Sequence, residues 1–291
     1  MLVAKGDVDM HKKWLCASVY GHFSLWAHSL RTILMVLFVL LLAYMSARSQ
    51  AQIVESYHME SVHMVEILYV YANNGFNLIM TTVGFLVMMS ELPKRVLYQQ
   101  YALIRLSRRK WLLSQVVFCL SASLVFILSL ALFSALFSIP FVSPGTEWSD
   151  LERLAVSPDS IFEPQLVREY IREISPVSAF VLAMTILYLF WTTLALLILL
   201  ITLAGAPNFG VVFCVSLVMA NITILFESLP EISFLLPTRF ATLAAVTGQV
   251  WENRLQHAFK IIIGYICVDA LLVFMMVGLV KHMDLRFIGK E

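Results

Sequence analysis

The longest stretch without a charged residue constrains this chain more than any other feature. It runs from Ile174 to Phe226, 53 residues that contain no Asp, Glu, Lys or Arg. A helix needs about 20 apolar residues to cross a bilayer, so this tract has room for two spans. Its strongest turn signal is Gly205-Ala206-Pro207-Asn208. We therefore predict membrane helices at about 177–203 and 209–226, joined by a tight turn.

The overall composition agrees with a chain that crosses the membrane several times. Hydrophobic residues make up 60% of the sequence and charged residues only 13%, whereas soluble domains carry about 25% charge. Each remaining apolar run is assigned one crossing, although the first, Thr32 to Ala47, is short at 16 residues and relies on the flanking Arg31 and Arg48 to reach the interface. The predicted fold is a single all-α membrane domain over residues 1–291, with six transmembrane helices at about 30–47, 66–89, 111–139, 177–203, 209–226 and 261–280.

Basic residues between the second and third predicted spans set the orientation. The segment from Ser90 to Gln115 carries six Lys and Arg residues and one acid, Glu91. Short loops rich in Lys and Arg stay in the cytoplasm. With six spans, both termini are then also cytoplasmic, and 13 of the 20 Lys and Arg residues lie on that side. The first apolar run is interpreted as a retained span, because its polar leader is too long for a typical signal peptide.

Four further segments have patterns of their own. Residues 10–30 read as an amphipathic interface helix, and a short amphipathic helix is expected between spans 2 and 3. The outer loop 141–176 is acidic. Region 227–260 contains prolines and apolar pieces of about ten residues, too short to cross, so we expect a re-entrant hairpin there. The amphipathic face expected for residues 10–30 consists of Trp14, Leu15, Tyr20, Phe23, Trp26 and Leu30.

No catalytic motif supports an enzyme. The sequence lacks GxSxG and HExxH, and its four cysteines are scattered, which favours neither a disulfide framework nor a zinc site. Its only Gly-Lys pair, Gly289-Lys290, is followed by Glu291 rather than the Ser or Thr of a phosphate-binding loop. The chain is therefore expected to bind no cofactor and no metal, and any ATP and Mg²⁺ would be held by a partner subunit.

Polar residues inside the predicted spans leave two interpretations open. Asn73, Asn74 and Asn77 lie in the outer half of span 2, and Asp269 lies near the middle of span 6. Polar groups at these depths are costly and should face protein or water. The amides either form hydrogen bonds between helices or line a substrate path. Asp269 either makes a packing contact or acts as a proton relay, an ion relay or a substrate contact.

The segment ALIRLSRRKWLLSQ, Ala102 to Gln115, contains R-x-x-R-R-K-W at the start of span 3. Together with the interface helix, the six spans and the re-entrant region, it resembles the permease subunits of ABC-2 type exporters of Gram-positive bacteria. The resemblance implies a permease that exports its substrate, working as a homodimer or with a paralogue in the bacterial cell membrane. Its partners would be cytoplasmic ATPase subunits and membrane lipid, and no nucleic acid.

In that family a coupling helix between spans 2 and 3 docks into the ATPase. The resemblance therefore places docking on Glu91 to Tyr101, with three arginines near lipid phosphates or the ATPase. The coupling residues it implies are Glu91, Lys94, Arg95, Tyr98, Tyr101, Arg105, Arg108 and Arg109. The alternative is a membrane protein without an ATPase: a proton-coupled carrier that uses Asp269, or a sensor or immunity protein. Carriers commonly have repeated halves, and no convincing repeat is present in the sequence.

Overall fold

The computed structural model describes residues 19–21, 23–24, 26–56, 62–66, 75–90, 92, 107–143, 145, 147–149, 174–227, 241 and 254–282. Its elements are, in chain order, α2 (Leu30–Ser56), β1 (Val62–His63), α4 (Gly75–Met89), α6 (Arg108–Ser138), the 3₁₀ turn η1 (Ile139–Phe141), β2 (Val142–Ser143), α9 (Pro176–Leu203), α10 (Pro207–Glu227) and α13 (Arg254–His282).

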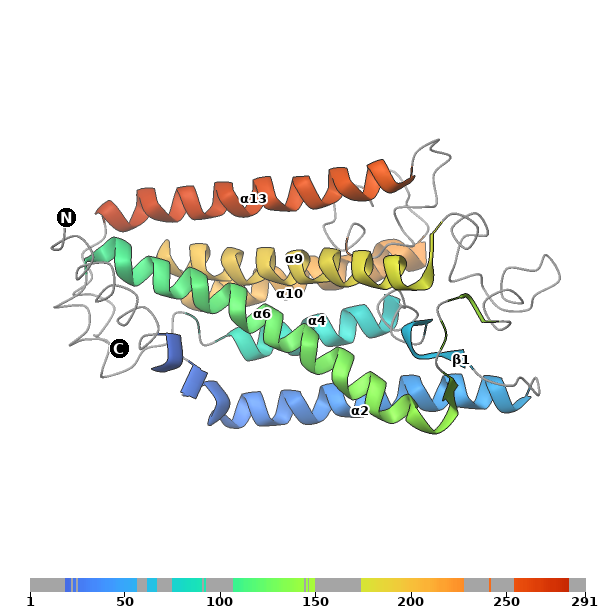
Figure 1. Cartoon of the computed structure of the whole chain (residues 1–291). Helices are drawn as coiled ribbons and strands as arrows, with labels where there is room; N and C mark the ends of the chain where they lie inside the picture. The colour runs from blue at the N-terminus through green and yellow to red at the C-terminus, as the bar shows by residue number, and fades with distance from the viewer. Residues whose placement is uncertain are drawn as a thin grey trace, which may run out of the picture.

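The helices form an elongated bundle with their axes roughly side by side (Figure 1). Successive long helices alternate in direction, so that the start of α2, the end of α4, the start of α6, the α9–α10 turn and the end of α13 share one end. Helix α9 packs against α4, α6, α10 and α13. The bundle therefore has α9 at its centre and α13 at its edge.

Four helices are long and apolar enough to cross a membrane, and they correspond to four of the six predicted spans. Their membrane-length stretches are Leu30–Arg48, Arg108–Ser138, Pro176–Leu203 and Ala258–Lys281. The other two predicted spans correspond to α4 and α10, whose described apolar stretches, Asn77–Met89 and Phe209–Ala220, are shorter. The described chain is thus a mostly helical, multi-pass membrane bundle.

The centre of the bundle is an aromatic cluster from three helices. The ring of Trp191 on α9 stacks on Phe85 of α4, with centroids 5.6 Å apart, and meets Phe126 of α6 edge-on at 4.8 Å. All three side chains are buried. Trp191 Nε1 also donates to Thr82 Oγ1 at 3.1 Å, which satisfies its polar edge within the apolar interior.

The turn between α9 and α10 lies where the sequence predicts it. Gly205 has φ 96°, a left-handed conformation that glycine adopts without a Cβ clash. The amide of Ala204 donates to Leu200 O at 3.0 Å and that of Gly205 to Thr202 O at 3.1 Å, closing the last turn of α9. Pro207 then begins α10, a first-turn position that needs no amide proton.

Two helices are longer than predicted. Helix α2 continues to Ser56, beyond the predicted end at Ala47, because the following residues contain no Gly or Pro to stop it. Helix α13 begins at Arg254, before the predicted start of the span at Ile261. The predicted re-entrant hairpin falls mainly on residues 228–240 and 242–253, outside the described part of the chain.

The segment before α2 only partly follows the predicted amphipathic face. Phe23 and Trp26 pack against Phe118 of α6, with ring centroids 5.2 and 6.2 Å from it. Tyr20 and Leu30, assigned to the same face, are exposed. Among the described members of the predicted face, Phe23 and Trp26 thus pack against α6, whereas Tyr20 and Leu30 do not share that burial. Trp14 and Leu15 lie outside the described residues.

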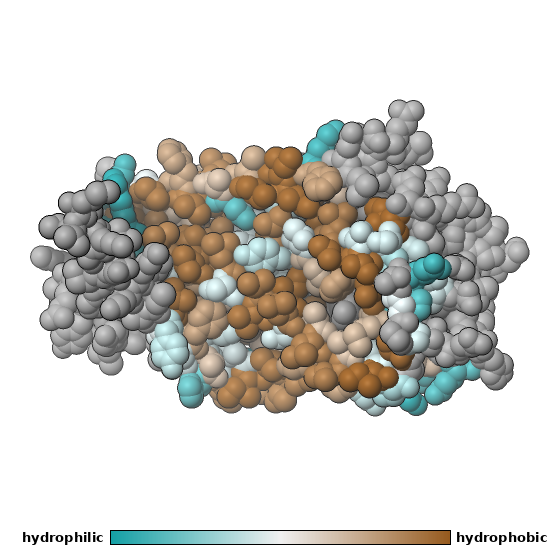
Figure 2. Space-filling model, in the orientation of Figure 1, coloured by the Kyte–Doolittle hydropathy of each residue, from teal (hydrophilic) through white to brown (hydrophobic). Residues whose placement is uncertain are grey.

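The surface has the pattern of a membrane protein. A band of apolar residues runs along the bundle, and the hydrophilic residues gather toward its two ends (Figure 2). Large exposed apolar side chains occur on each membrane-length helix, for example Leu37, Leu128, Val181 and Phe274. Such a surface is costly in water, and a lipid bilayer removes that cost.

Candidate functional site

One end of the bundle is strongly basic. We call it the basic end and define it by Arg31, Arg108, Arg109, Lys110 and Lys281, which are all exposed. Among the residues described at this end there is no acid. The described charged residues toward the opposite end are mixed in sign: Arg48, Glu55, Glu66, Glu147 and Lys260.

Two hydrogen bonds join helices at the basic end. Arg31 Nη1 at the start of α2 donates to Ser90 Oγ, just after α4, at 3.1 Å. Arg108 Nη1 in the first turn of α6 donates to the Lys281 carbonyl of α13, also at 3.1 Å. The chain therefore leaves α4 and enters α6 at the same end, and the connection between them starts and finishes there.

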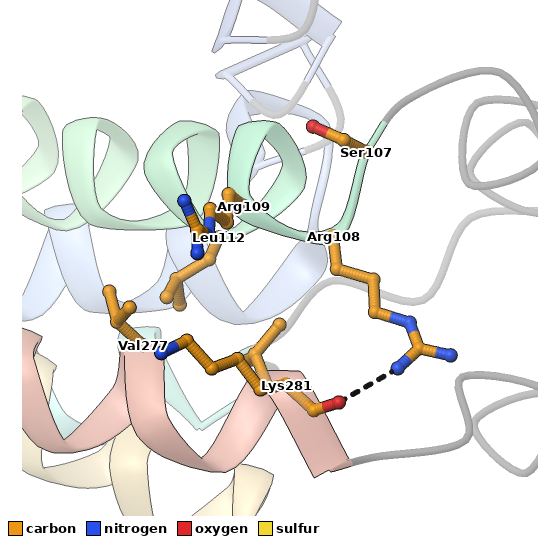
Figure 3. A pocket seen from close by; sticks show the side chains of 7 residues that line it. Ser107, Arg108, Arg109, Leu112, Val277 and Lys281 are labelled. Atoms are coloured by element: carbon orange, nitrogen blue, oxygen red, sulfur yellow. Dashed lines mark hydrogen bonds between the residues drawn. The ribbon is translucent and has the colours of Figure 1, made fainter.

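A groove of about 260 Å³ lies between the start of α6 and the end of α13. The side chains of Leu112, Val277 and Val280 form its apolar walls, and Ser107, Arg108, Arg109 and Lys281 complete the lining. Figure 3 shows the Arg108–Lys281 bond beside the groove and the Lys281 side chain running back along α13 toward Val277. This groove brings two predicted coupling residues, Arg108 and Arg109, together with a lysine from α13.

Most of the predicted coupling segment lies outside the described residues. Of the eight residues assigned to it, the structure describes only Arg108 and Arg109, in the first turn of α6. Those outside the described part are Glu91, Lys94, Arg95, Tyr98, Tyr101 and Arg105. Asn73 and Asn74, assigned to the substrate path, also lie outside it.

Asp269 faces α9, where a threonine approaches its carboxylate. Thr193 Oγ1 lies 2.6 Å from Asp269 Oδ1, and this contact links α9 to α13. The same hydroxyl lies 3.0 Å from the Leu189 carbonyl of its own helix. Tyr188 and Tyr265 are close enough to interact electrostatically with the carboxylate. The packing contact considered for Asp269 is thus present, with Thr as its partner.

The Thr193 hydroxyl carries one proton, so it donates to one of its two acceptors at a time. When Asp269 is ionised, its carboxylate accepts a hydrogen bond from the Thr193 hydroxyl. A protonated Asp269 can instead donate to Thr193 Oγ1, which leaves the hydroxyl proton for the Leu189 carbonyl. Both protonation states of Asp269 can therefore be satisfied by the same three groups. This arrangement is compatible with a structural role and with proton exchange.

The polar face of α4 is used for packing where the structure describes it. Thr82 accepts the hydrogen bond from Trp191 on α9. Thr81 Oγ1 donates to the carbonyl of Asn77 one turn earlier, at 2.6 Å. Asn77 itself is half-buried and has an interaction partner. Thr82 therefore joins α4 to α9 through a hydrogen bond between helices, and of the three predicted amides the structure describes only Asn77.

At the opposite end of the bundle is a polar cap that the sequence does not predict. It consists of β1, β2, Glu66, Gly145, Trp148 and Ser149. Strands β1 and β2 pair in parallel, with Val62 opposite Val142 and His63 opposite Ser143. Two-residue strands have no periodicity that a sequence pattern could reveal. Gly145 packs against the His63 ring so closely that a Cβ there would overlap it. The one sequence signal for this contact is the glycine itself, inside the loop after span 3.

The cap also buries a carboxylate. The amide of Ser149 donates to Glu66 Oε1, while Oε2 is buried without a hydrogen-bond partner among the described residues. His63 Nδ1 lies 3.8 Å from Oε1. Burial raises the pKa of Glu66 above its ordinary value, and the hydrogen bond from Ser149 and the charge of His63 oppose that rise.

The same cap fixes the two ends of the outer loop. Trp148 Nε1 donates to the carbonyl of Ile174 at 2.9 Å, and both side chains are buried. Residues 150–173, between them, lie outside the described part of the chain. Within the described ranges, no group of three His, Cys, Asp or Glu side chains could hold a metal ion.

Comparisons with known proteins find no family model, no curated protein and no solved structure that matches this chain. The geometry of the described residues therefore provides the observations on which a function can be proposed.

Proposed function

We propose that this chain is the membrane-spanning permease subunit of an ATP-driven exporter of the ABC-2 type, which docks a separate cytoplasmic ATPase. One observation carries the proposal. The connection from α4 to α6 begins at Ser90, held by Arg31, and ends at Arg108, held by the Lys281 carbonyl. A segment that starts and finishes at the basic end of a membrane bundle is available to a partner on that side. The family resemblance places the coupling helix in this segment, between spans 2 and 3.

The charge distribution supports an orientation for this proposal. The basic end carries five described Lys and Arg side chains and no described acid. Positive charge of this kind is retained on the cytoplasmic side of membrane proteins. The basic end would then face the cytoplasm of a bacterial cell, with both termini there and six spans in all.

In this proposal the protein catalyses no reaction itself. Two ATPase subunits would bind ATP and Mg²⁺, and a second permease copy or a paralogue would complete the substrate path. Coupling would pass through the segment with Tyr98 and Tyr101, then through Arg108 and Arg109 into α6. Because α6 contacts α2, α9 and α13, a displacement of its first turn would reach most of the bundle.

The test is an affinity purification of the tagged protein from its native host in a mild detergent, followed by an ATPase assay. We expect a nucleotide-binding subunit to co-purify. Changing Tyr98→Glu together with Tyr101→Glu should remove it, because two carboxylates would replace the aromatic contacts of the docking segment. The matched control is Tyr20→Glu, which changes an exposed tyrosine in the segment before α2 and should leave the partner bound.

The second candidate is a proton-coupled carrier, or a sensor or immunity protein, that works without an ATPase. The contact between Thr193 and Asp269 favours it, because the pair can accommodate both protonation states of the carboxylate. Three results together would exclude the exporter and favour this candidate. The protein would purify without a partner, the preparation would hydrolyse no ATP, and Asp269→Asn would abolish the function of the protein in cells.

A further inference from the structure

The groove between α6 and α13 has the features of a lipid site rather than of a simple gap between helices. Its walls combine apolar side chains, Leu112, Val277 and Val280, with the basic side chains of Arg108, Arg109 and Lys281. Leu112 and Val280 are almost fully buried, whereas the three basic residues are exposed. The accessible surface inside the groove is wholly apolar, so the basic side chains line it with their carbon atoms and their charged groups form a cationic rim at its edge.

We propose that the cationic rim of this groove binds the headgroup of an anionic phospholipid, with phosphatidylglycerol as its simplest representative, and that the attached acyl chains lie in the groove and on the neighbouring apolar surface of α6 and α13. Basic pockets between transmembrane helices bind acidic lipid headgroups in this way. The site shares Arg108 and Arg109 with the proposed coupling path, but it consists of the chain's own residues at the ends of two membrane-length helices, so lipid binding needs no ATPase.

The position of the groove matches the depth of a headgroup. Arg108 and Arg109 occupy the first turn of α6, and Lys281 is the last residue of the membrane-length stretch of α13. Long basic side chains at such positions reach the membrane–water interface. The exposed side chains next to the groove, Leu113 on α6 and Phe274 on α13, are apolar. A lipid held at the rim would therefore find a continuous surface for its chains.

The charges in the groove have different roles. Arg108 donates to the Lys281 carbonyl and so fixes the start of α6 next to the end of α13. The Arg109 guanidinium and the Lys281 ammonium form no ion pair with any residue that the structure describes. They are the two groups that a phosphate would neutralise. A guanidinium can offer two parallel donors to phosphate oxygens, and an ammonium adds a point charge.

The size of the groove favours part of a lipid over a whole ligand. Its volume of about 260 Å³ is below the range of about 300 to 1,000 Å³ that encloses a drug-sized molecule. The start of an acyl chain needs no more than such a space, because the headgroup lies at the rim and the rest of the lipid stays in the bilayer. An acidic protein segment is the competing occupant, but it would leave the apolar interior of the groove and the adjoining lipid-facing surface unused.

The experiment titrates the purified full-length chain with dioleoyl phosphatidylglycerol or dioleoyl phosphatidylcholine in detergent and counts bound lipids by native mass spectrometry. Wild type should retain phosphatidylglycerol in preference to phosphatidylcholine. The double variant Arg109→Gln/Lys281→Gln should weaken phosphatidylglycerol binding by about 20-fold or more, since each basic residue contributes about a fivefold factor. Phosphatidylcholine binding should not change.

The matched control is Arg48→Gln/Lys260→Gln, which removes the same charge from exposed positions toward the opposite end of α2 and α13. It should bind phosphatidylglycerol like wild type. A second variant, Val277→Trp, fills the groove without changing its charge and should also lose the preference. Thermal unfolding in the same detergent identifies any variant that fails to fold.

Three results would overturn the proposal. Equal retention of the two lipids, or an equal loss in the control pair, would mean that the basic end attracts acidic lipid without a site. Equally tight binding of water-soluble glycerophosphoglycerol would identify a site for free anions. Loss of a co-purified ATPase in Arg109→Gln/Lys281→Gln, with no lipid preference in wild type, would assign the groove to a protein partner. Because the lipid titration uses the chain alone, it stands or falls separately from the proposed exporter function.

Discussion

Single residues show two ways of holding a carboxylate in this bundle. Asp269, on a membrane-length helix, has the Thr193 hydroxyl at hydrogen-bond distance on the neighbouring helix. Glu66, which the sequence predicts as the first residue of span 2, lies in the structure before the start of α4 and in the cap. One of its oxygens accepts from Ser149, and the other is buried without a partner among the described residues. An incompletely solvated carboxylate favours its protonated form. Glu66 is thus the residue through which pH should act on the folded state.

We predict that the free energy of unfolding falls less with increasing pH in Glu66→Gln than in the wild type. The raised pKa means that the folded protein keeps the Glu66 proton after the unfolded chain has released it. The free energy of unfolding therefore falls as the pH rises above the ordinary value of 4.5. Gln keeps an acceptor for Ser149 and does not titrate. Thermal unfolding midpoints between pH 5 and 8 should fall less steeply in this variant.

Glu55→Gln is the control for this experiment, because it removes the same charge from an exposed position at the end of α2. It should keep the pH dependence of wild type. An unchanged slope in Glu66→Gln would show that burial of this carboxylate contributes nothing to the pH dependence.

Among the helices, α9 has the central role and α13 the peripheral one. In an apolar 18-residue window of each helix, 61% of the α9 residues are buried inside the bundle but only 22% of the α13 residues. Helix α9 accordingly carries Trp191, which contacts both α4 and α6 through the aromatic cluster. Side chains of α13 such as Phe274 point to the outside. Removing a large aromatic side chain should therefore destabilise the folded protein much more on α9 than on α13.

We predict that Trp191→Ala lowers the free energy of unfolding by about 3 to 5 kcal/mol, the usual cost of removing a large buried aromatic side chain. The change leaves a cavity between Phe85 and Phe126 and removes the hydrogen bond to Thr82. The measurement is thermal or denaturant unfolding in detergent. Phe274→Ala, at a side chain 76% exposed, should have little effect. A similar loss in both variants would contradict the central position of α9.

The described surface is apolar along the bundle, with hydrophilic residues toward both ends (Figure 2). The basic end holds Arg31, Arg108, Arg109, Lys110 and Lys281 and no described acid, whereas the opposite end is mixed in sign, with Arg48, Glu55, Glu66, Glu147 and Lys260. In the proposed function this asymmetry directs the basic end toward the cytoplasm, because basic loops of membrane proteins are retained there.

We predict that Ser107→Cys and Glu147→Cys are accessible from opposite sides of the membrane. Both positions are exposed, Ser107 at the basic end and Glu147 in the cap. In a background without the native cysteines, a membrane-impermeant maleimide should label Glu147→Cys in intact cells and Ser107→Cys only in inside-out vesicles. The reverse pattern would invert the proposed orientation, and labelling of both from one side would contradict the arrangement of the helices.

The sequence by itself determined the class of this protein and the position of several helices. The charge-free tract Ile174–Phe226 predicted α9 and α10 with their turn, and the apolar runs predicted α2, α6 and α13 to within about ten residues at each end. These features depend on properties that act locally: the length needed to cross a bilayer, the cost of charge in lipid and the conformation of Gly205.

Only the tertiary structure decided which side chains meet. Thr193 and Asp269 are 76 residues apart, Arg108 and Lys281 173 apart, and Ser149 and Glu66 83 apart. Helices that are apolar almost all round carry little periodic information about which face meets which neighbour. The partner of Asp269, the groove at the basic end and the cap around Glu66 therefore follow from helix packing, which juxtaposes residues that no local pattern connects.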